Sequence, residues 1–160
     1  MRVRRAVDGD WRAVRELRLE ALQEAPLAFA STYAREAAFS DEVWRGRIAG
    51  AAQFLALVGD EVVGTATGYV DDSDPDTVRL VAMYVRPEHR GQGYAVQLLD
   101  GVVADARARG FDRVLLDVVD TNTPARWCYL RYGFRPTGVV APLPHAPQHT
   151  ETEMVLTLRR

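Results

Sequence analysis

An arginine followed by two glycines, which are separated by one residue, forms the segment best suited to bind phosphate. Residues 90–95 read Arg-Gly-Gln-Gly-Tyr-Ala and lie between an apolar run that ends at Val85 and a helical pattern. Backbone N–H groups at a helix N-terminus bind phosphate oxygens, and glycine lets the main chain approach a diphosphate without hindrance from a Cβ atom. Arg90 adds a charged donor. The segment predicts a diphosphate site; the alternative is a glycine turn that only begins a helix.

Two other kinds of phosphate loop are excluded by the residue types. A Walker loop ends in Gly-Lys-Ser or Gly-Lys-Thr, but this chain contains no lysine, since all 20 of its Lys and Arg residues are arginine. A dinucleotide-binding loop needs a further small residue three positions after its second glycine, where this chain has Val96. The ligand of the predicted diphosphate site therefore belongs to another class.

A second pattern follows downstream, where Asn122, Ala125 and Tyr129 precede a Gly-Phe pair at 133–134. In order and spacing, the two patterns resemble the motifs of the GCN5-related N-acetyltransferase (GNAT) superfamily. The first motif of that family is Arg/Gln-x-x-Gly-x-Gly/Ala, and its second is Asn-x-x-Ala-x-x-x-Tyr-x-x-x-Gly-Phe. The resemblance extends from about Phe54 to the end of the chain.

The resemblance implies an acetyl-CoA-dependent N-acetyltransferase without a metal. It also implies that the strand ending at Val85 splays from the next strand and leaves a V-shaped cleft for acetyl-CoA, the acyl donor. The residues implied to bind it are Met83, Tyr84 and Val85 along the pantetheine, Arg90, Gly91, Gln92, Gly93, Tyr94, Ala95 and Val96 around the pyrophosphate, and Asn122 near the pantetheine or an ordered water.

Acetyl transfer to an amine makes three chemical demands. An alkyl ammonium has a pKa near 10 and must lose a proton before it attacks, the tetrahedral intermediate needs hydrogen-bond donors for its oxyanion, and the leaving thiolate must gain a proton. A main-chain N–H of the splayed strand can serve the oxyanion. Tyr129 matches the family's tyrosine and is the candidate acid. Its alternative role is a buried aromatic residue beside Trp127 and Tyr132.

The general base is harder to assign, because the strand Val78–Val85 offers no carboxylate. Asp117, on the next strand, occupies a position where some N-terminal acetyltransferases of the family carry a basic glutamate. Being one methylene shorter, it would act through water, or else it pairs with Arg113 or Arg79. Cys128, the only cysteine, is expected to be a small buried residue and not an acyl carrier, because helix neighbours point about 100° apart.

The elements that must position these residues follow from hydrophobic periodicity and from turn and cap signals. A strand, helix and strand around residues 78–119 predict a parallel crossover unit in a mixed α/β fold. The resemblance implies the GNAT fold, a mixed, mostly antiparallel sheet of six to seven strands that splays in the middle and is flanked by about four helices. The expected strands are Val3–Ala6, a hairpin of Phe54–Val58 and Val62–Val70, Val78–Val85, Arg113–Val119, Phe134–Val140 and Met154–Leu158. The expected helices run from an Asp8 N-cap to Glu24, from a Ser40 N-cap to Ala49 (a short one), from Gly93 to a Gly110 cap, and from a Thr123 N-cap to about Arg131. A turn or loop is expected at Asp72–Asp76, and a proline-rich loop joins the last two strands.

Composition sets the remaining limits. A length of 160 residues suits a single domain, 1–160, and 48% hydrophobic with 26% charged residues is typical of a soluble globular protein. The formal net charge of −2 does not indicate the basic surface that a nucleic-acid-binding protein needs. Neither a signal peptide nor a membrane span is apparent, and His89, His145 and His149 form no metal pattern. We expect a cytoplasmic, bacterial enzyme, and the resemblance allows a homodimer through terminal strands.

The acceptor is expected near the first two helices. Candidates for its lining are Phe29, Tyr33, Glu36, Asp41 and Trp44, with the Asp71–Asp76 loop opposite. An acidic and aromatic lining suits a small cationic amine. The favoured function is direct attack of a small-molecule primary amine on acetyl-CoA in a ternary complex. Two alternatives stay open, a protein N-terminal or lysine acetyltransferase and a non-catalytic acyl-CoA-binding sensor.

Overall fold

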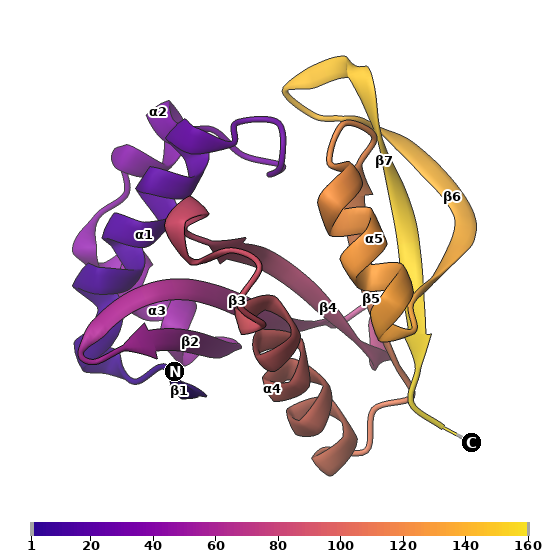
Figure 1. Cartoon of the computed structure of the whole chain (residues 1–160), viewed down its shortest axis with the longest axis horizontal. Helices are drawn as coiled ribbons and strands as arrows, with labels where there is room; N and C mark the ends of the chain where they lie inside the picture. The colour runs from indigo at the N-terminus through magenta and orange to yellow at the C-terminus, as the bar shows by residue number, and fades with distance from the viewer. Residues whose placement is uncertain (1, 160) are drawn as a thin grey trace.

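In the part of the chain that the structure describes, seven strands form one sheet in the order β1-β2-β3-β4-β5-β7-β6 (Figure 1). The computed structural model describes residues 2–159. Among the strand pairs of these residues, β4–β5 is parallel and the others are antiparallel. The strands are β1 (Arg2–Arg5), β2 (Ala52–Val58), β3 (Glu61–Asp71), β4 (Asp74–Val85), β5 (Arg113–Val119), β6 (Arg135–Leu143) and β7 (Ala146–Thr157). The predicted mixed sheet with its central crossover unit is confirmed.

Helices cover both faces of this sheet. On one face α1 (Trp11–Glu24) and α3 (Asp41–Ala49) share a core with β2, β3 and β4, and α2 (Tyr33–Ala37) lies against α1. On the other face α4 (Tyr94–Ala108) and α5 (Thr123–Tyr132) share a second core with β3, β4, β5 and β7. Short 3-10 helices span Asp8–Asp10 and Pro87–His89.

Helix α4 forms where its apolar periodicity predicted it. Its buried side chains are Tyr94, Leu98, Leu99, Val102, Val103 and Ala106. Burying each of the larger ones contributes roughly 1.5–3 kcal/mol, so the helix is anchored to the sheet along its whole length. The chain leaves the helix through Gly110 at φ +81°, a left-handed conformation that favours glycine.

The parallel strands β4 and β5 stay together over a short stretch only. Their register pairs Thr77 with Arg113, Val78 with Val114 and Arg79 with Leu115, and it records no pair beyond these. Both strands continue, β4 to Val85 and β5 to Val119. Figure 1 shows the two strands diverging from their paired ends, so one edge of each strand is left without a strand partner in the described chain.

A bulge lies in β4 where it separates from β5. Thr65 of β3 pairs with Tyr84 and Thr67 with Val81, so two β4 residues face the single β3 residue between them. One of these two, Ala82, has φ +55°, a left-handed conformation that costs an ordinary residue about 1–2 kcal/mol. The bulge redirects the main chain of Met83–Val85 relative to the preceding strand.

Two of the predicted helix caps are wrong. Asp8 begins a 3-10 turn and not α1, and its neighbour Asp10 accepts the N–H of Val7. Helix α5 is capped by Asn122, whose side chain accepts the N–H of Ala125 at 3.4 Å, so Thr123 is the first helical residue. The Ser40 cap of α3 is confirmed by the bond from the N–H of Val43.

The last two strands are longer than their sequence pattern indicated. The predicted proline-rich loop is instead a tight hairpin end, in which Leu143 pairs with Ala146. β6 lies at the sheet edge, and every residue in it except Leu143 is exposed, so hydrophobic alternation gave little signal there. Helix α2 was not predicted either, because its five residues are too few for a periodic pattern.

Candidate active site

A cleft of about 710 Å³ opens where β4 and β5 separate. Its walls come from the end of β4, the loop and first turn of α4, the end of β5, helix α5 and the segment after α1. The lining residues are Ala25, Pro26, Leu27, Ala28, Phe29, Met83, Tyr84, Val85, His89, Arg90, Gly91, Gly93, Tyr94, Ala95, Val96, Val119, Thr121, Asn122, Pro124, Ala125, Cys128 and Tyr129. All the predicted donor-binding residues line this cleft except Gln92, whose side chain bonds the carbonyl of Glu88.

The loop before α4 presents main-chain donors to the cleft. Gly91 and Gly93 have φ of +75° and +88°, and a Cβ added to either would meet no atom within 4 Å. Gly93 is the N-cap and offers no side-chain acceptor. Within residues 2–159, no acceptor is recorded for the N–H groups of residues 91–96. These donors, at the positive end of the helix dipole, fit a diphosphate.

The guanidinium of Arg90 is held by protein oxygens. Its Nε donates to the carbonyl of Val85 at 2.8 Å, its Nη2 lies 2.9 Å from Glu24 Oε2, and it stacks over the ring of Tyr84. Arg90 thus ties the separated end of β4 to the end of α1. The predicted diphosphate site therefore consists mainly of main-chain donors, and Arg90 holds its loop against β4 and α1.

The end of β4 turns side chains toward both cores. Val85 packs with α4 and Tyr84 packs with the α1 side of the sheet. The Tyr84 hydroxyl is buried and has no recorded hydrogen-bond partner in the described chain. Burial, followed by the negative charges of Glu24 and Glu20, raises the pKa of Tyr84 to about 12. Tyr84, which lines the cleft, therefore keeps its phenolic proton.

Tyr129 is almost wholly buried, at 7% exposure, and lines the cleft. Its ring packs edge-on against Phe134 at 5.8 Å, which fixes its direction. Burial raises the pKa of the Tyr129 phenol far above its usual range, so the hydroxyl keeps its proton and can donate it. The thiol of the adjacent Cys128 is half-buried, and burial raises its pKa too, which disfavours the thiolate that an acyl carrier needs.

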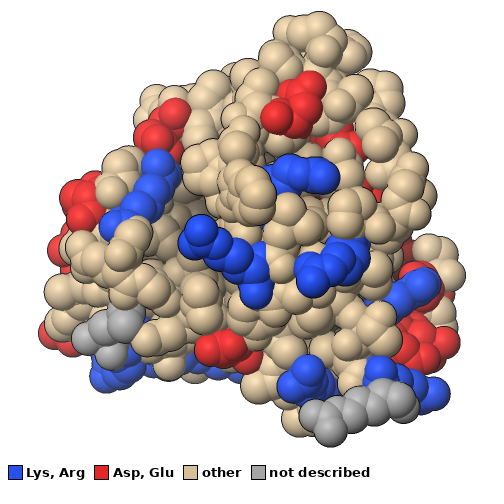
Figure 2. Space-filling model, turned by 45° about the vertical axis from the view of Figure 1, so that its right-hand side comes forward, with Lys and Arg blue, Asp and Glu red and all other residues tan. Residues whose placement is uncertain are grey.

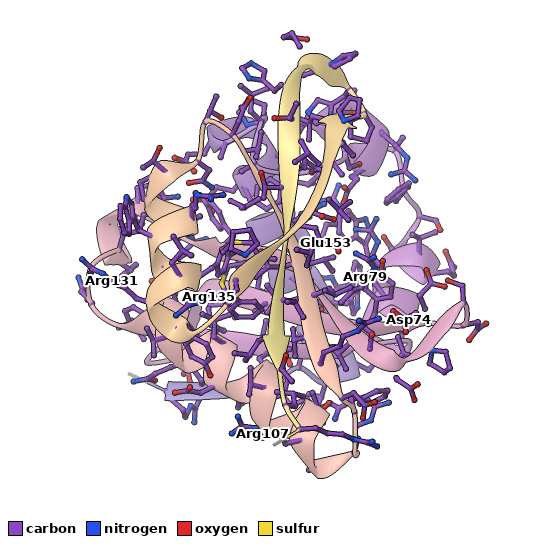
Figure 3. All side chains as sticks on the ribbon, turned by 90° about the vertical axis from the view of Figure 1, so that its right-hand side faces the viewer. Asp74, Arg79, Arg107, Arg131, Arg135 and Glu153 are labelled. Carbon is purple, nitrogen blue, oxygen red and sulfur yellow. The ribbon has the colours of Figure 1, made fainter. Side chains whose placement is uncertain are left out.

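Asp117 lies outside the cleft lining. Its carboxylate is 3.8 Å from Arg79, which also approaches Glu153 at 3.6 Å. Figure 3 shows Arg79 and Glu153 on the side of the sheet away from α5 and Arg131. Burial raises the pKa of Asp117, the charge of Arg79 lowers it and that of Glu153 raises it. Of the two arginines proposed as partners of Asp117, Arg79 is the one that pairs with it.

The end of the cleft where the acceptor is expected is bounded by the segment after α1. Phe29 is buried and lines the cleft as expected. The hairpin between β6 and β7 reaches this segment, because His145 Nε2 lies 2.9 Å from the carbonyl oxygen of Pro26 and Leu27 packs against a cluster of Val119, Leu143 and Ala146. In Figure 1 this segment and the hairpin tip stand at the same upper end of the molecule.

Other residues predicted to line the acceptor site lie elsewhere. Glu36 is completely buried between Arg18 and Arg47, and Trp44 is buried in the α1–α3 core. Asp71 ends β3 and Asp74–Asp76 begin β4, so the turn between these strands is shorter than the loop predicted at Asp72–Asp76 and lies at the end of β4 opposite Val85. No local residue pattern distinguishes the main-chain and apolar lining at residues 25–28 as part of the cleft.

A second hollow, of about 730 Å³, adjoins the first on the outer side of α5. It is lined by Val96, Pro124, Trp127, Cys128, Arg131 and Tyr132, of which Val96, Pro124 and Cys128 also line the main cleft. Trp127 is 59% exposed there. Figure 2 brings this side of the molecule forward and shows arginine side chains at the centre of the face. The Trp127 ring and the Arg131 guanidinium in this lining together suit a phosphorylated nucleoside.

Residues 2–159 contain no group of three or more His, Cys, Asp or Glu side chains placed to hold a metal ion. None of the helices in that range is long and apolar enough to span a membrane.

Comparison with known proteins gives one consistent result. A family model described as "Acetyltransferase (GNAT) family" matches residues 11–134. An uncharacterised N-acetyltransferase of Schizosaccharomyces pombe is 33% identical over 86 residues, which are 52% of this chain and 53% of that protein. The chain therefore spans about half the length of this curated relative.

Solved structures share the fold over the whole chain. A putative acetyltransferase from Salmonella typhimurium, solved with acetyl-CoA, superposes with a TM-score of 0.84 at 20% identity and covers 100% of this chain and 95% of that one. A ribosomal-protein-alanine N-acetyltransferase from Brucella melitensis gives a TM-score of 0.82 at 20% identity, with coverage of 99% and 100%. At these identities the likeness concerns the fold.

Proposed function

Because the chain belongs to the GNAT acetyltransferase family, we propose that it transfers the acetyl group of acetyl-CoA to the primary amine of a small molecule, by direct attack in a ternary complex. The observation that carries this proposal is the single cleft that joins the N-terminus of α4 to Tyr129 between the separated strands. A diphosphate and a reacting thioester would then lie in one cavity.

Main-chain groups would form most of the part of the cleft that binds acetyl-CoA. The N–H groups of residues 91–96 would hold the pyrophosphate, and the β4 edge at Met83–Val85 would bond the pantetheine, with the Val85 carbonyl already occupied by Arg90. The side-chain oxygen of Asn122 caps α5, so its side-chain amide nitrogen is the atom available to bond acetyl-CoA. The hollow at Trp127 and Arg131 would take the adenosine and its phosphate.

Two features of the cleft suit the chemistry. The bulge at Ala82 turns the main chain near Met83, so that an N–H there can meet the oxyanion. The protonated phenol of Tyr129 can give its proton to the leaving thiolate. Asp117, the carboxylate expected to act as a base through water, is paired with Arg79.

A small acceptor is supported by the contact between the β6–β7 hairpin and the segment after α1. His145 and Leu143 on one side meet Pro26 and Leu27 on the other. This contact places the hairpin against a wall of the cleft, whereas a lysine within a folded protein needs an open groove.

The test is thiol release from acetyl-CoA with a panel of acceptors. The panel holds aliphatic diamines, amino acids, a peptide with a free N-terminus and an N-blocked peptide with an internal lysine. Turnover of a small amine is the expected result. Turnover of peptides alone would contradict the small acceptor, and acetyl-CoA binding without transfer to any acceptor or to water would contradict an enzymatic role.

A further inference from the structure

Glu151 of β7 lies beside Val119 of β5, the β5 residue that lines the cleft. Directly paired residues of antiparallel strands point to the same face, with Cβ atoms about 4.5–5.5 Å apart. On that face Val119 packs against Leu27, Leu143 and Ala146. The Glu151 side chain therefore stands next to the wall of the acceptor end, one strand away from the cleft lining.

The other carboxylates on this face are already paired. Asp117 lies 3.8 Å and Glu153 3.6 Å from the guanidinium of Arg79, and Glu153 also accepts the hydroxyl of Thr137 at 3.0 Å. For Glu151, no ion pair or hydrogen bond of the side chain is recorded within residues 2–159. Among these acids, Glu151 is the one whose oxygens are free to accept a proton.

The other titratable groups near the cleft are less suited to this task. His89, which lines the cleft, lies before the glycine loop of α4 with its ring against Tyr94, at the predicted diphosphate end. Glu24 is bound to Arg90, and His145 is bound to the Pro26 carbonyl. Cys128 and Tyr129 are protonated groups whose pKa values are raised by burial. They can donate protons but are poor acceptors.

The charges around Glu151 favour proton uptake. Burial is the largest cause that raises the pKa of Glu151, the negative charge of Asp117 raises it further, and His145 lowers it. Glu153 lies two residues away on the same strand face, beside Arg79. His149, two residues away in the other direction, is paired with Asp120 at 3.1 Å. A raised pKa makes a carboxylate a stronger base.

We propose that Glu151 is the general base of the acetyl transfer and takes the proton of the acceptor's ammonium group, directly or through one water. This inference rests on the proposed function. The neutral amine then forms a bond to the thioester carbonyl carbon, and the C–S bond breaks. Tyr129 gives its proton to the thiolate sulfur and regains one from the nitrogen of the intermediate. Glu151 releases its proton to solvent.

The experiment measures kcat/KM as a function of pH for the wild type, Glu151→Gln and the matched control Glu153→Gln. The acceptor is the best amine of the panel. Slow hydrolysis of acetyl-CoA, with water as the acceptor, is measured as well. We expect Glu151→Gln to lose about 100-fold or more and to lose the acidic limb of the profile, while Glu153→Gln keeps that limb. Glu151→Asp should restore part of the rate. The Kd of acetyl-CoA, measured by calorimetry, should not change.

A second readout separates a base from a structural role. An acceptor amine whose pKa lies below the assay pH arrives already neutral, so the defect of Glu151→Gln should shrink about tenfold or more with it. An unchanged pH profile in Glu151→Gln, or loss of the acidic limb in Asp117→Asn instead, would overturn the assignment while leaving the proposed function intact. A wild type that binds acetyl-CoA but transfers acetyl neither to an amine nor to water would overturn both.

Discussion

Arg90, on the loop before α4, places its Nη2 2.9 Å from Glu24 Oε2 at the last residue of α1. The same guanidinium donates to the Val85 carbonyl at 2.8 Å. One side chain therefore joins the loop before α4, the separated end of β4 and the last residue of α1.

Replacing Arg90 should weaken the binding of acetyl-CoA. In Arg90→Gln, we expect the Kd of acetyl-CoA to rise about tenfold, equivalent to about 1.4 kcal/mol, because the loop loses its tie to β4. Isothermal titration calorimetry measures this. Arg107→Gln, on the exposed last turn of α4, is the control and should bind as the wild type does. An unchanged Kd in Arg90→Gln would show that the main chain holds the loop without help.

The two glycines at the ends of α4 allow a comparison of stability with acetyl-CoA binding. Gly93 and Gly110 both have positive φ and open space where a Cβ would go, at opposite ends of α4. Each change to alanine should cost a similar amount of stability, about 1 kcal/mol. Only Gly93→Ala should also raise the Kd of acetyl-CoA, by about tenfold or more, since strain there displaces the N–H groups of the diphosphate site. Thermal unfolding and calorimetry on both variants check this, and equal Kd values would contradict it.

Tyr129 can be tested against a tyrosine on the same helix. Tyr129→Phe should lower kcat about 100-fold and change the Kd of acetyl-CoA little, because the ring stays packed on Phe134. Tyr132 donates its hydroxyl to Asp100 at 2.7 Å, outside the main cleft, so Tyr132→Phe should keep kcat within a few-fold. Wild-type turnover in Tyr129→Phe would remove this hydroxyl from the mechanism.

Local signals explain what the sequence predicted well. The loop at 90–95, the apolar stripe of α4 and the strand Arg113–Val119 each depend on residues close together in the chain, and the structure has all three where expected. Asn122 and Thr123 both have cap-forming side chains, so sequence could not decide between them. The bond from the N–H of Ala125 does so.

The acceptor end could not be predicted for a different reason. Its boundary depends on His145 meeting Pro26, residues 119 positions apart, and on apolar residues of ordinary type. Glu151 likewise gains its candidate role only through its register opposite Val119. No local sequence pattern predicts the register of β7 or the contact of its hairpin with the segment after α1.

Glu36 allows a prediction on stability and pH. Its carboxylate is fully buried and accepts from Arg18 at 3.0 and 2.9 Å and from Arg47 at 2.6 Å. Burial alone would raise the pKa of Glu36, but the hydrogen bonds and charges of its partners, chiefly Arg18, prevail and lower it from 4.5 to about 2. At neutral pH this difference corresponds to roughly 3 kcal/mol of folding free energy.

The expected result is a destabilisation of Glu36→Gln by roughly 3 kcal/mol at neutral pH, since two arginines lose the charge between them. Because the pKa of Glu36 is lower in the folded state, its contribution is fully present above the unfolded value and is lost as pH falls from about 4.5 toward 2. Urea unfolding across this range should show the wild type and variant converging in acid. Asp8→Asn, which breaks an exposed pair with Arg45, should shift the midpoint far less, and a pH-independent gap for Glu36→Gln would contradict the charge argument.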